Sequence, residues 1–309
     1  MSREIVNQLT WSVSRDRLFR QCKRAYYYNY YGSWGGWDSG ADSRTRKIYI
    51  LKNMQSLQMW AGGVVHETAA EALRRYAAKH AEIDKNRLFA DARKKLRQGW
   101  RQAVNREWLL HPKKTNLFEL YYGNGADLPE DRTESVKNRV YGCLAEFADS
   151  PLLQEAVRAS YLNWKPVDSL DSFLLDQEIK VWCAIDFAFF DQQGSLRIVD
   201  WKTGSEHPEE LRLQLACYAL YAMQEWRTPL ERLRLFGVFL GEEGRSSEYQ
   251  ITEPQLRETT SAIKQSINDM RSMLKDPEKN QAREQDFPPC ENDKICARCN
   301  FREVCPAVN

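Results

Sequence analysis

Residues 172–202 carry the pattern that decides the fold, and they read SFLLDQEIKVWCAIDFAFFDQQGSLRIVDWK. Residues 172–190 are rich in apolar and β-branched side chains, residues 191–194 end in a glycine, and residues 195–201 resume the apolar pattern. Apolar runs separated by a short glycine turn are typical of neighbouring β-strands. We therefore expect a β-sheet in this part of the chain.

Acidic and basic side chains stand at the ends of these predicted strands. Asp186 ends one apolar run, and Asp200 and Lys202 end the next. Residues two apart in a strand share a face, so Asp200 and Lys202 point the same way. Because neighbouring strands lie about 4.8 Å apart, Asp186 and Asp200 can share one cation, and their oxygens favour Mg²⁺ or Mn²⁺ over zinc. A bound cation would polarise a phosphate while Lys202 positions water or offsets charge.

The simpler interpretation of Asp186, Asp200 and Lys202 is a set of charges at a hairpin end with a surface ion pair.

His66 has two interpretations as well. It shares a small, apolar helical face with Gly62, Ala69 and Leu73, which is typical of a satisfied core histidine. Beside a carboxylate site, its imidazole is a reasonable ligand for Mn²⁺ or Mg²⁺.

A polar and aromatic stripe follows on the next predicted helix, residues 208–227. Gln214, Tyr218 and Tyr221 lie at i, i+4 and i+7, so they share one face. In isolation this stripe is ordinary core. Behind Lys202 it predicts contacts to a substrate phosphate.

Together these motifs resemble the PD-(D/E)XK nuclease superfamily, and within it the RecB-type branch. The family order is matched by Gly-Gly-x-x-His66, Ala-Ile-Asp186, Asp200-Trp-Lys202 and Gln214-x-x-x-Tyr218. The resemblance implies an α/β fold with an αβββαβ core, in which helices flank a mixed sheet. It also implies a metal bound by His66, Asp186, Asp200 and the main-chain carbonyl of Trp201, with Lys202 catalytic.

Five of the eight cysteines lie outside apolar stretches: Cys22, Cys290, Cys296, Cys299 and Cys305. Cys296 and Cys299 form a C-x2-C pair, with Cys305 six positions after Cys299. A tetrahedral metal site and a cubane cluster each need four ligands, and these three cysteines leave one position open. Either Cys22 or Cys290 fills it. From spacing alone, a zinc ribbon that uses Cys290 stays open.

The stretch around Cys22 resembles the first-cysteine helix of the iron–sulfur nucleases of the same branch, which include AddB-type helicase–nuclease subunits and CRISPR-associated RecB-like nucleases. That resemblance implies a [4Fe-4S] cluster held by Cys22, Cys296, Cys299 and Cys305, with Cys290 as a spare thiol. Lys23 stands where a proline usually follows the first cysteine. The cluster would join the two ends of the chain and couple metal binding to folding.

The chain has 309 residues and a net charge of +2, and we expect a single nuclease domain over residues 1–309. The first-cysteine helix is expected within residues 1–31, as a helix over 15–31 with Ser14 as its N-cap, and a further helix over 54–79. A helical insertion is expected at 86–165. The catalytic core is expected at 172–275, with a strand at 232–241 and a helix at 254–275, and the cysteine cluster at 290–305. Basic runs are expected to meet phosphates or to form solvated helix faces. One lies on the first helix and comprises Arg15, Arg17, Arg20, Lys23 and Arg24; another comprises Arg93, Lys94, Lys95, Arg97, Arg101 and Arg106.

The predicted activity is metal-dependent cleavage of DNA by an exonuclease that acts on single strands or ends. The chain lacks a P-loop motif, so a helicase or recombination partner in trans is expected. No membrane span or signal peptide is apparent, and we expect a cytoplasmic protein. The alternatives are a non-catalytic DNA-binding or adaptor protein with a nuclease fold, and a zinc-stabilised interaction protein.

Overall fold

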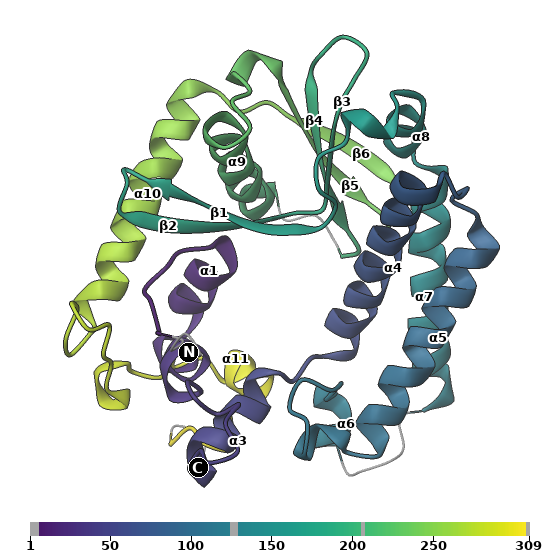
Figure 1. Ribbon diagram of the computed structural model, residues 1–309. Helices are drawn as coiled ribbons and strands as arrows, with labels where there is room; N and C mark the ends of the chain where they lie inside the picture. The colour runs from purple at the N-terminus through teal and green to yellow at the C-terminus, as the bar shows by residue number, and fades with distance from the viewer. Residues whose placement is uncertain (1–5, 124–128, 205–207, 307–309) are drawn as a thin grey trace.

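A computed structural model describes residues 6–123, 129–204 and 208–306, and its centre is a mixed sheet in the order β3-β4-β5-β6 (Figure 1). The strands are β3 Phe187–Phe190, β4 Leu196–Lys202, β5 Leu233–Phe239 and β6 Arg245–Tyr249. β4 and β5 run parallel, whereas β3 with β4 and β5 with β6 are antiparallel. Parallel neighbours need a crossover, and helix α9 (Pro208–Gln224) supplies it between β4 and β5.

Alternation along β4 divides the interior into two cores. Ile198 packs in the core beneath α9 and α10 (Glu253–Ser272). Val199 and Trp201 pack in the opposite core, against helices that include α4 (Leu57–Lys79). A strand covered on both faces is apolar at successive positions, which explains the run Ile198–Val199. The sheet is therefore enclosed between two layers of helices, which Figure 1 shows on its two sides.

The long apolar run that precedes β4 contains β3 and, before it, two further strands. β1 (Ser169–Leu175) and β2 (Ile179–Ile185) make an antiparallel hairpin whose turn residues Asp176 and Gln177 have φ of 49° and 62°. β2 leads directly into β3, with Asp186 alone between them. The chain therefore changes sheets at Asp186.

Helices dominate the region expected to be an insertion. Their bounds are α5 Lys85–Val104, η2 Glu107–Leu109, α6 Phe118–Tyr122, α7 Glu130–Asp149, α8 Pro151–Arg158 and η3 Tyr161–Asn163. α5 and α7 lie beside α4 on one side of the sheet (Figure 1). Their apolar residues join the core that also receives Val199 and Trp201.

The single helix predicted over residues 15–31 is wrong. α1 (Val13–Gln21) is capped by Ser12, not Ser14, and ends before Cys22, whose φ of −161° is extended. Cys22 then caps α2 (Lys23–Tyr27), because its sulfur accepts the Ala25 N–H. A π-helical turn η1 (Tyr28–Gly32) and α3 (Ser43–Lys52) follow.

The C-terminal segment returns to these N-terminal helices, as the position of α11 beside them shows (Figure 1). It contains η5 (Glu284–Asp286) and α11 (Asp293–Ala297). Arg24 Nε donates to the Phe287 carbonyl at 2.7 Å, and the Tyr28 hydroxyl reaches the Val304 carbonyl at 2.9 Å. The two ends of the described chain therefore pack together.

The remaining predicted elements are confirmed with shifted ends: α4, α9, β5 and α10 correspond to the expected elements over 54–79, 208–227, 232–241 and 254–275. The sequence analysis did not predict α3, β6, α11 or the short turn η4 (Leu230–Arg232). Among the described residues, no helix is both long and apolar enough to cross a membrane.

A buried polar contact joins the first helix to α10 and gives a test of the fold. The Asp16 carboxylate, 4% exposed, accepts the Ser266 hydroxyl at 2.5 Å, and Ser266 in turn accepts Trp11 Nε1 at 3.0 Å. We expect Asp16→Ala to lower the free energy of unfolding by about 1–3 kcal/mol, because a buried donor loses its acceptor. Urea denaturation measures this change.

The matched control is Asp269→Ala, which removes an exposed carboxylate from the same helix α10. Its effect should stay within about 0.5 kcal/mol. Equal effects of the two substitutions would contradict a stabilising role for the Asp16 contact.

Candidate active site

Asp186 and Asp200 meet across the first strand pair of the central sheet. Phe187 pairs with Val199, so the same register continued by one residue sets Asp186 opposite Asp200. The Asp186 carboxylate accepts the Trp201 backbone N–H at 2.8 Å, and the Asp186 carbonyl accepts the Asp168 N–H at 2.9 Å. Asp186 is thus held by backbone donors on both sides.

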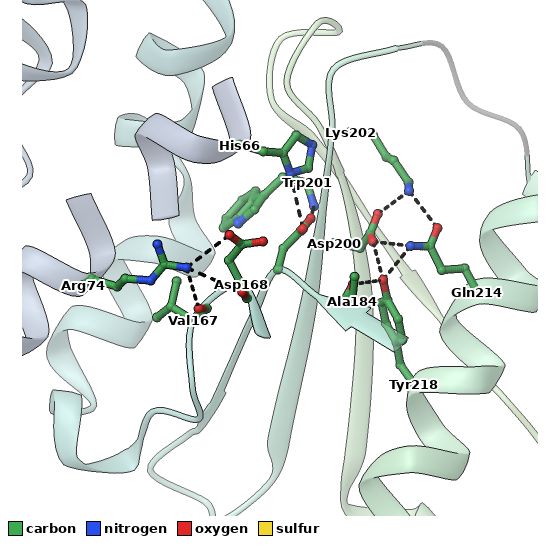
Figure 2. Close-up of polar contacts among 11 residues, drawn as sticks. His66, Arg74, Val167, Asp168, Ala184, Asp200, Trp201, Lys202, Gln214 and Tyr218 are labelled. Carbon is green, nitrogen blue, oxygen red and sulfur yellow. Dashed lines mark hydrogen bonds and ion pairs between the residues drawn. The ribbon is translucent and has the colours of Figure 1, made fainter. Parts of the chain in front are cut away.

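Lys202 lies beside Asp200 on the same face of β4, as the two-residue spacing predicts. Its Nζ is 2.7 Å from Asp200 Oδ2 and donates to Gln214 Oε1 at 2.8 Å (Figure 2). Gln214 Nε2 donates to Asp200 Oδ1 at 2.9 Å. The amide of Gln214 therefore bridges the lysine and the carboxylate.

Tyr218 lies one turn after Gln214 on α9 and is buried. Its hydroxyl contacts the Ala184 carbonyl and lies 3.2 Å from Asp200 Oδ1. This places Gln214 and Tyr218 around Asp200, with both side chains at the wall of a cleft. Tyr221 instead packs edge-on against Trp226 in the core.

His66 approaches the carboxylates from α4 (Figure 2). Its Nδ1 is 3.3 Å from Asp186 Oδ1. A close approach of α4 to the sheet permits this contact, since a Cβ added at Gly62 would lie 2.9 Å from Thr203 Oγ1. His66 is therefore half-buried beside the carboxylates and not enclosed in apolar core.

A contact that the sequence analysis missed fixes α4 relative to Asp186. Arg74 Nη2 donates to Asp168 Oδ2 and to the Val167 carbonyl, both at 3.1 Å (Figure 2). Asp168 also supplies the N–H that Asp186 accepts. These residues are separated by a long stretch of sequence, so no local pattern could reveal the contact.

The carboxylates perturb the ionisation of their neighbours. Burial raises the pKa of Asp200 to about 6, and the Lys202 ammonium opposes that rise. The Asp186 carboxylate raises the pKa of His66 to about 9. Burial also raises the pKa of Tyr218 well above its usual value, so its hydroxyl remains a donor near neutral pH. The site favours positive charge.

The donor set fits a hard divalent cation. Among the residues that the structure describes, no hydrogen-bond partner reaches the buried Asp200 Oδ2, and the Lys202 ammonium lies 2.7 Å from it. Asp186, Asp200 and His66 supply carboxylate and imidazole donors of the kind that Mg²⁺ and Mn²⁺ accept. Within residues 6–123, 129–204 and 208–306, however, no three His, Cys, Asp or Glu side chains already surround a metal position. Binding therefore requires that His66 and Lys202 turn away from the carboxylate oxygens they now contact.

A cleft of about 530 Å³ opens beside Lys202. Its walls come from the start of α1, from the β1–β2 hairpin and from α9, and they include Ser12, Arg15, Arg17, Trp182 and Gln214. Arg17 forms an ion pair with Glu210 across it. Sequence reasoning missed this wall, although the basic run on the first helix was a signal for it.

The five cysteines outside the apolar stretches also come together. Cys22, Cys290, Cys296, Cys299 and Cys305 line one small pocket between α2 and the C-terminal segment. Cys290 Sγ is 3.8 Å from Cys296 Sγ. Cys290, which the sequence analysis set aside as a spare thiol, therefore lies within the group.

Within the described residues no three of these thiols already surround a metal position, but backbone N–H groups reach two of the sulfurs. The Ala25 N–H donates to Cys22 Sγ and the Phe301 N–H donates to Cys299 Sγ, both at 3.4 Å. Such donors favour thiolates. Burial nevertheless raises the pKa of Cys299 to about 11, so binding of a cation would release protons.

Comparison with known proteins gives one match and one absence. A family model described as the PD-(D/E)XK nuclease superfamily matches residues 10–306. No curated protein matches the chain. The match and the mixed sheet flanked by helices confirm the expected α/β fold class.

The His66–Asp186 pair makes a prediction about pH. In metal-free protein with EDTA, the imidazole of His66 should titrate near pH 9, because the adjacent carboxylate stabilises its protonated form. A pKa raised in the folded state adds stability that is complete below the unfolded value of 6.5 and is lost as pH rises through about 9. Imidazole NMR measures the titration, with His66→Gln to assign the signal.

Asp186→Asn keeps the shape of the side chain and removes its charge. The pKa of His66 should then fall toward its ordinary value. A pKa of His66 that is the same in wild-type and Asp186→Asn protein would contradict the contact.

Proposed function

The chain belongs to the PD-(D/E)XK nuclease superfamily, and from this premise we propose that it hydrolyses phosphodiester bonds of DNA with Mg²⁺ or Mn²⁺. The observation that carries the proposal is the meeting of Asp186, Asp200 and Lys202 at one end of the β3–β4 pair, with His66 beside them. Nucleases of this superfamily typically use these two metals. A solvent-accessible cleft adjoins Lys202, with Gln214 and Tyr218 also in its wall.

We assign metal binding to His66, Asp186, Asp200 and the main-chain carbonyl of Trp201. A divalent cation held there would polarise the scissile phosphate and lower the pKa of attacking water. Asp186 is positioned for this role by two backbone N–H donors, from Trp201 and Asp168. Asp200 is positioned by Gln214 and Tyr218.

Lys202 is the proposed catalytic residue. Its ammonium is free to leave Asp200 once a cation neutralises that carboxylate, and Gln214 can continue to hold it at the cleft. There it orients water and offsets the negative charge that develops on the phosphate. Gln214 and Tyr218 are proposed to contact substrate as well, since both line the cleft.

The proposed substrate is single-stranded DNA or a DNA end, cut by exonuclease action. Support comes from the cleft beside Lys202, whose wall combines Arg15 and Arg17 with Tyr30 and Trp182. Cations and aromatic rings together suit a flexible single strand, because they meet its phosphates and stack on its bases. A helicase or recombination partner in trans and a cytoplasmic location complete the proposal.

We further propose that the chain belongs to the RecB-type iron–sulfur branch, with a [4Fe-4S] cluster held by Cys22, Cys296, Cys299 and Cys305. The supporting observation is that these thiols converge on one pocket from opposite ends of the chain. A cluster there would fasten α2 to the C-terminal segment. On this proposal residues 1–309 form one nuclease domain with a helical insertion at 86–165, a core at 172–275 and the cluster segment at 290–305.

Zinc remains the second candidate for this pocket, because Cys290 Sγ lies 3.8 Å from Cys296 Sγ. A zinc site of Cys290, Cys296, Cys299 and Cys305 needs no N-terminal ligand. The two candidates differ in the metal and in whether Cys22 is a ligand.

The proposed chemistry is tested with Lys202→Ala. We expect cleavage of end-labelled single-stranded DNA to fall at least about a hundredfold, because charge stabilisation at the phosphate is lost. EDTA should abolish wild-type cleavage, and Mg²⁺ or Mn²⁺ should restore it. Gel analysis of labelled products measures the rate and the polarity.

The control is Lys275→Ala, which removes an exposed lysine just beyond α10. It should cleave at the wild-type rate. Cleavage by Lys202→Ala at that same rate would overturn the catalytic assignment and favour a non-catalytic DNA-binding protein.

The cluster is tested by anaerobic purification followed by iron, sulfide and zinc assays. Cys22→Ala should lose iron, whereas Cys290→Ala should retain it. Cys143→Ala is the control for general damage, since Cys143 is buried in the core of α7, away from the pocket. Zinc without iron in wild-type protein would reject the cluster, and iron loss from Cys290→Ala alone would replace the fourth ligand.

A further inference from the structure

We propose that the groove between α4, α5 and α7 binds a segment of single-stranded DNA and leads it toward the carboxylates. The inference rests on the proposed function, since it concerns the path of the same substrate. It assigns a role to the predicted insertion, whose helices α5 and α7 form two of the groove's walls. The groove is distinct from the cleft beside Lys202 and has a volume of about 370 Å³.

The basic run on α5 divides into two faces. Lys95 faces α4, where its Nζ is 2.8 Å from Glu67 and 2.7 Å from Glu71. Asp91 on the same helix pairs with Arg75 of α4 at 2.8 Å. Charges on this face are thus neutralised within the protein and serve helix packing.

Arg93 and Arg97 lie on the other face and are exposed. They are four residues apart, so they follow one another along a stripe that Trp100 continues at the next turn. Within the part of the chain that the structure describes, neither arginine has an ion-pair partner. Two adjacent cations at the edge of a groove, with no protein carboxylate paired to them, are available to an anionic ligand.

Aromatic and basic side chains line the same groove from the other helices. α7 contributes Lys137 and Tyr141, and α4 contributes Trp60 at the base. The Trp60 ring packs closely on Gly99 of α5. A Cβ added at Gly99 would lie only 2.8 Å from Trp60 Nε1, so the position requires a glycine. Trp100 and Tyr141 are half-buried, so each leaves part of a ring accessible to a ligand.

The charge of the lining favours nucleic acid over a protein segment. Three cations line the groove against one carboxylate, Glu134, which already pairs with Lys137 at 2.5 Å. Single-stranded DNA matches both features, because its phosphates pair with Arg93 and Arg97 while its bases stack on aromatic rings. Duplex DNA keeps its bases paired and does not present them to such rings.

The groove and the carboxylates are connected through shared elements. Trp60 precedes His66 by six residues on α4, which is about 9 Å along the helix axis. Gly62 of α4 and Arg139 of α7 both contact Thr203, the residue after Lys202. A strand seated in the groove therefore reaches the carboxylates after a few nucleotides.

Binding is measured by fluorescence anisotropy with a labelled oligothymidylate of about 20 nucleotides in EDTA, so that no cleavage occurs. We expect Arg93→Ala/Arg97→Ala to weaken binding at least tenfold. The slope of log affinity against log salt should fall by about 1.4, since each lost contact to a single strand contributes about 0.7. Trp100→Ala should weaken binding about fivefold or more and leave the slope unchanged.

The matched control is Arg87→Ala/Lys94→Ala. It removes the same charge from exposed positions of α5 that do not line the groove. Its affinity and salt slope should equal those of the wild type, and thermal melts check that all variants fold. The proposal would be overturned if Arg93→Ala/Arg97→Ala and Arg87→Ala/Lys94→Ala lost the same affinity, or if the wild-type protein did not bind the oligonucleotide.

Cleavage assays separate this proposal from the proposed function. A substrate of about four nucleotides is too short to occupy both sites, so Arg93→Ala/Arg97→Ala should cleave it at the wild-type rate and cleave the long substrate more slowly. The loss of cleavage expected for Lys202→Ala is measured in a separate assay from DNA binding by anisotropy, so the two proposals are tested independently. A wild-type protein that binds DNA in the groove but does not cleave it would support the proposed binding groove and contradict the proposed nuclease activity.

Discussion

Two carboxylates held together in a largely buried site are the constraint on which the rest of the structure depends. Burial of Asp200 opposes its charge, and the nearby Asp186 carboxylate opposes it further. The fold offsets this cost with Lys202, Gln214 and Tyr218 around Asp200 and with backbone donors around Asp186. These partners come from β4, from α9 and from Asp168, the residue before β1, so the carboxylates require these parts of the fold to be assembled together.

The two-sided burial of the sheet explains how those parts are positioned. β4 sends Ile198 into one core and Val199 and Trp201 into the other, so neither helical layer can shift without disturbing the strand that carries Asp200 and Lys202. α5 and α7 belong to the second core. The helices predicted as an insertion are therefore part of the support for β4, in addition to forming a groove at the surface.

The sequence was sufficient where the signal was local. Period-two spacing predicted that Asp200 and Lys202 share a face, and apolar runs located β4, β5 and α9. It was insufficient where a distant partner decides the conformation. The break at Cys22 was missed because Cys22 acts as an N-cap, and the role of Arg74 was missed because Asp168 is remote in sequence. Strand β6, with its polar exposed face, is stabilised by pairing with β5 and lacks an apolar run of its own.

The return of the C-terminal segment to α2 has a consequence for biosynthesis. Tyr28 and Val304 are 276 positions apart, so the contact between them cannot form until nearly the whole chain has left the ribosome. At about 5–20 residues per second, the N-terminal helices wait roughly 15–55 s for that partner. During this interval Cys22 and Tyr28 lack their final packing against the C-terminal segment.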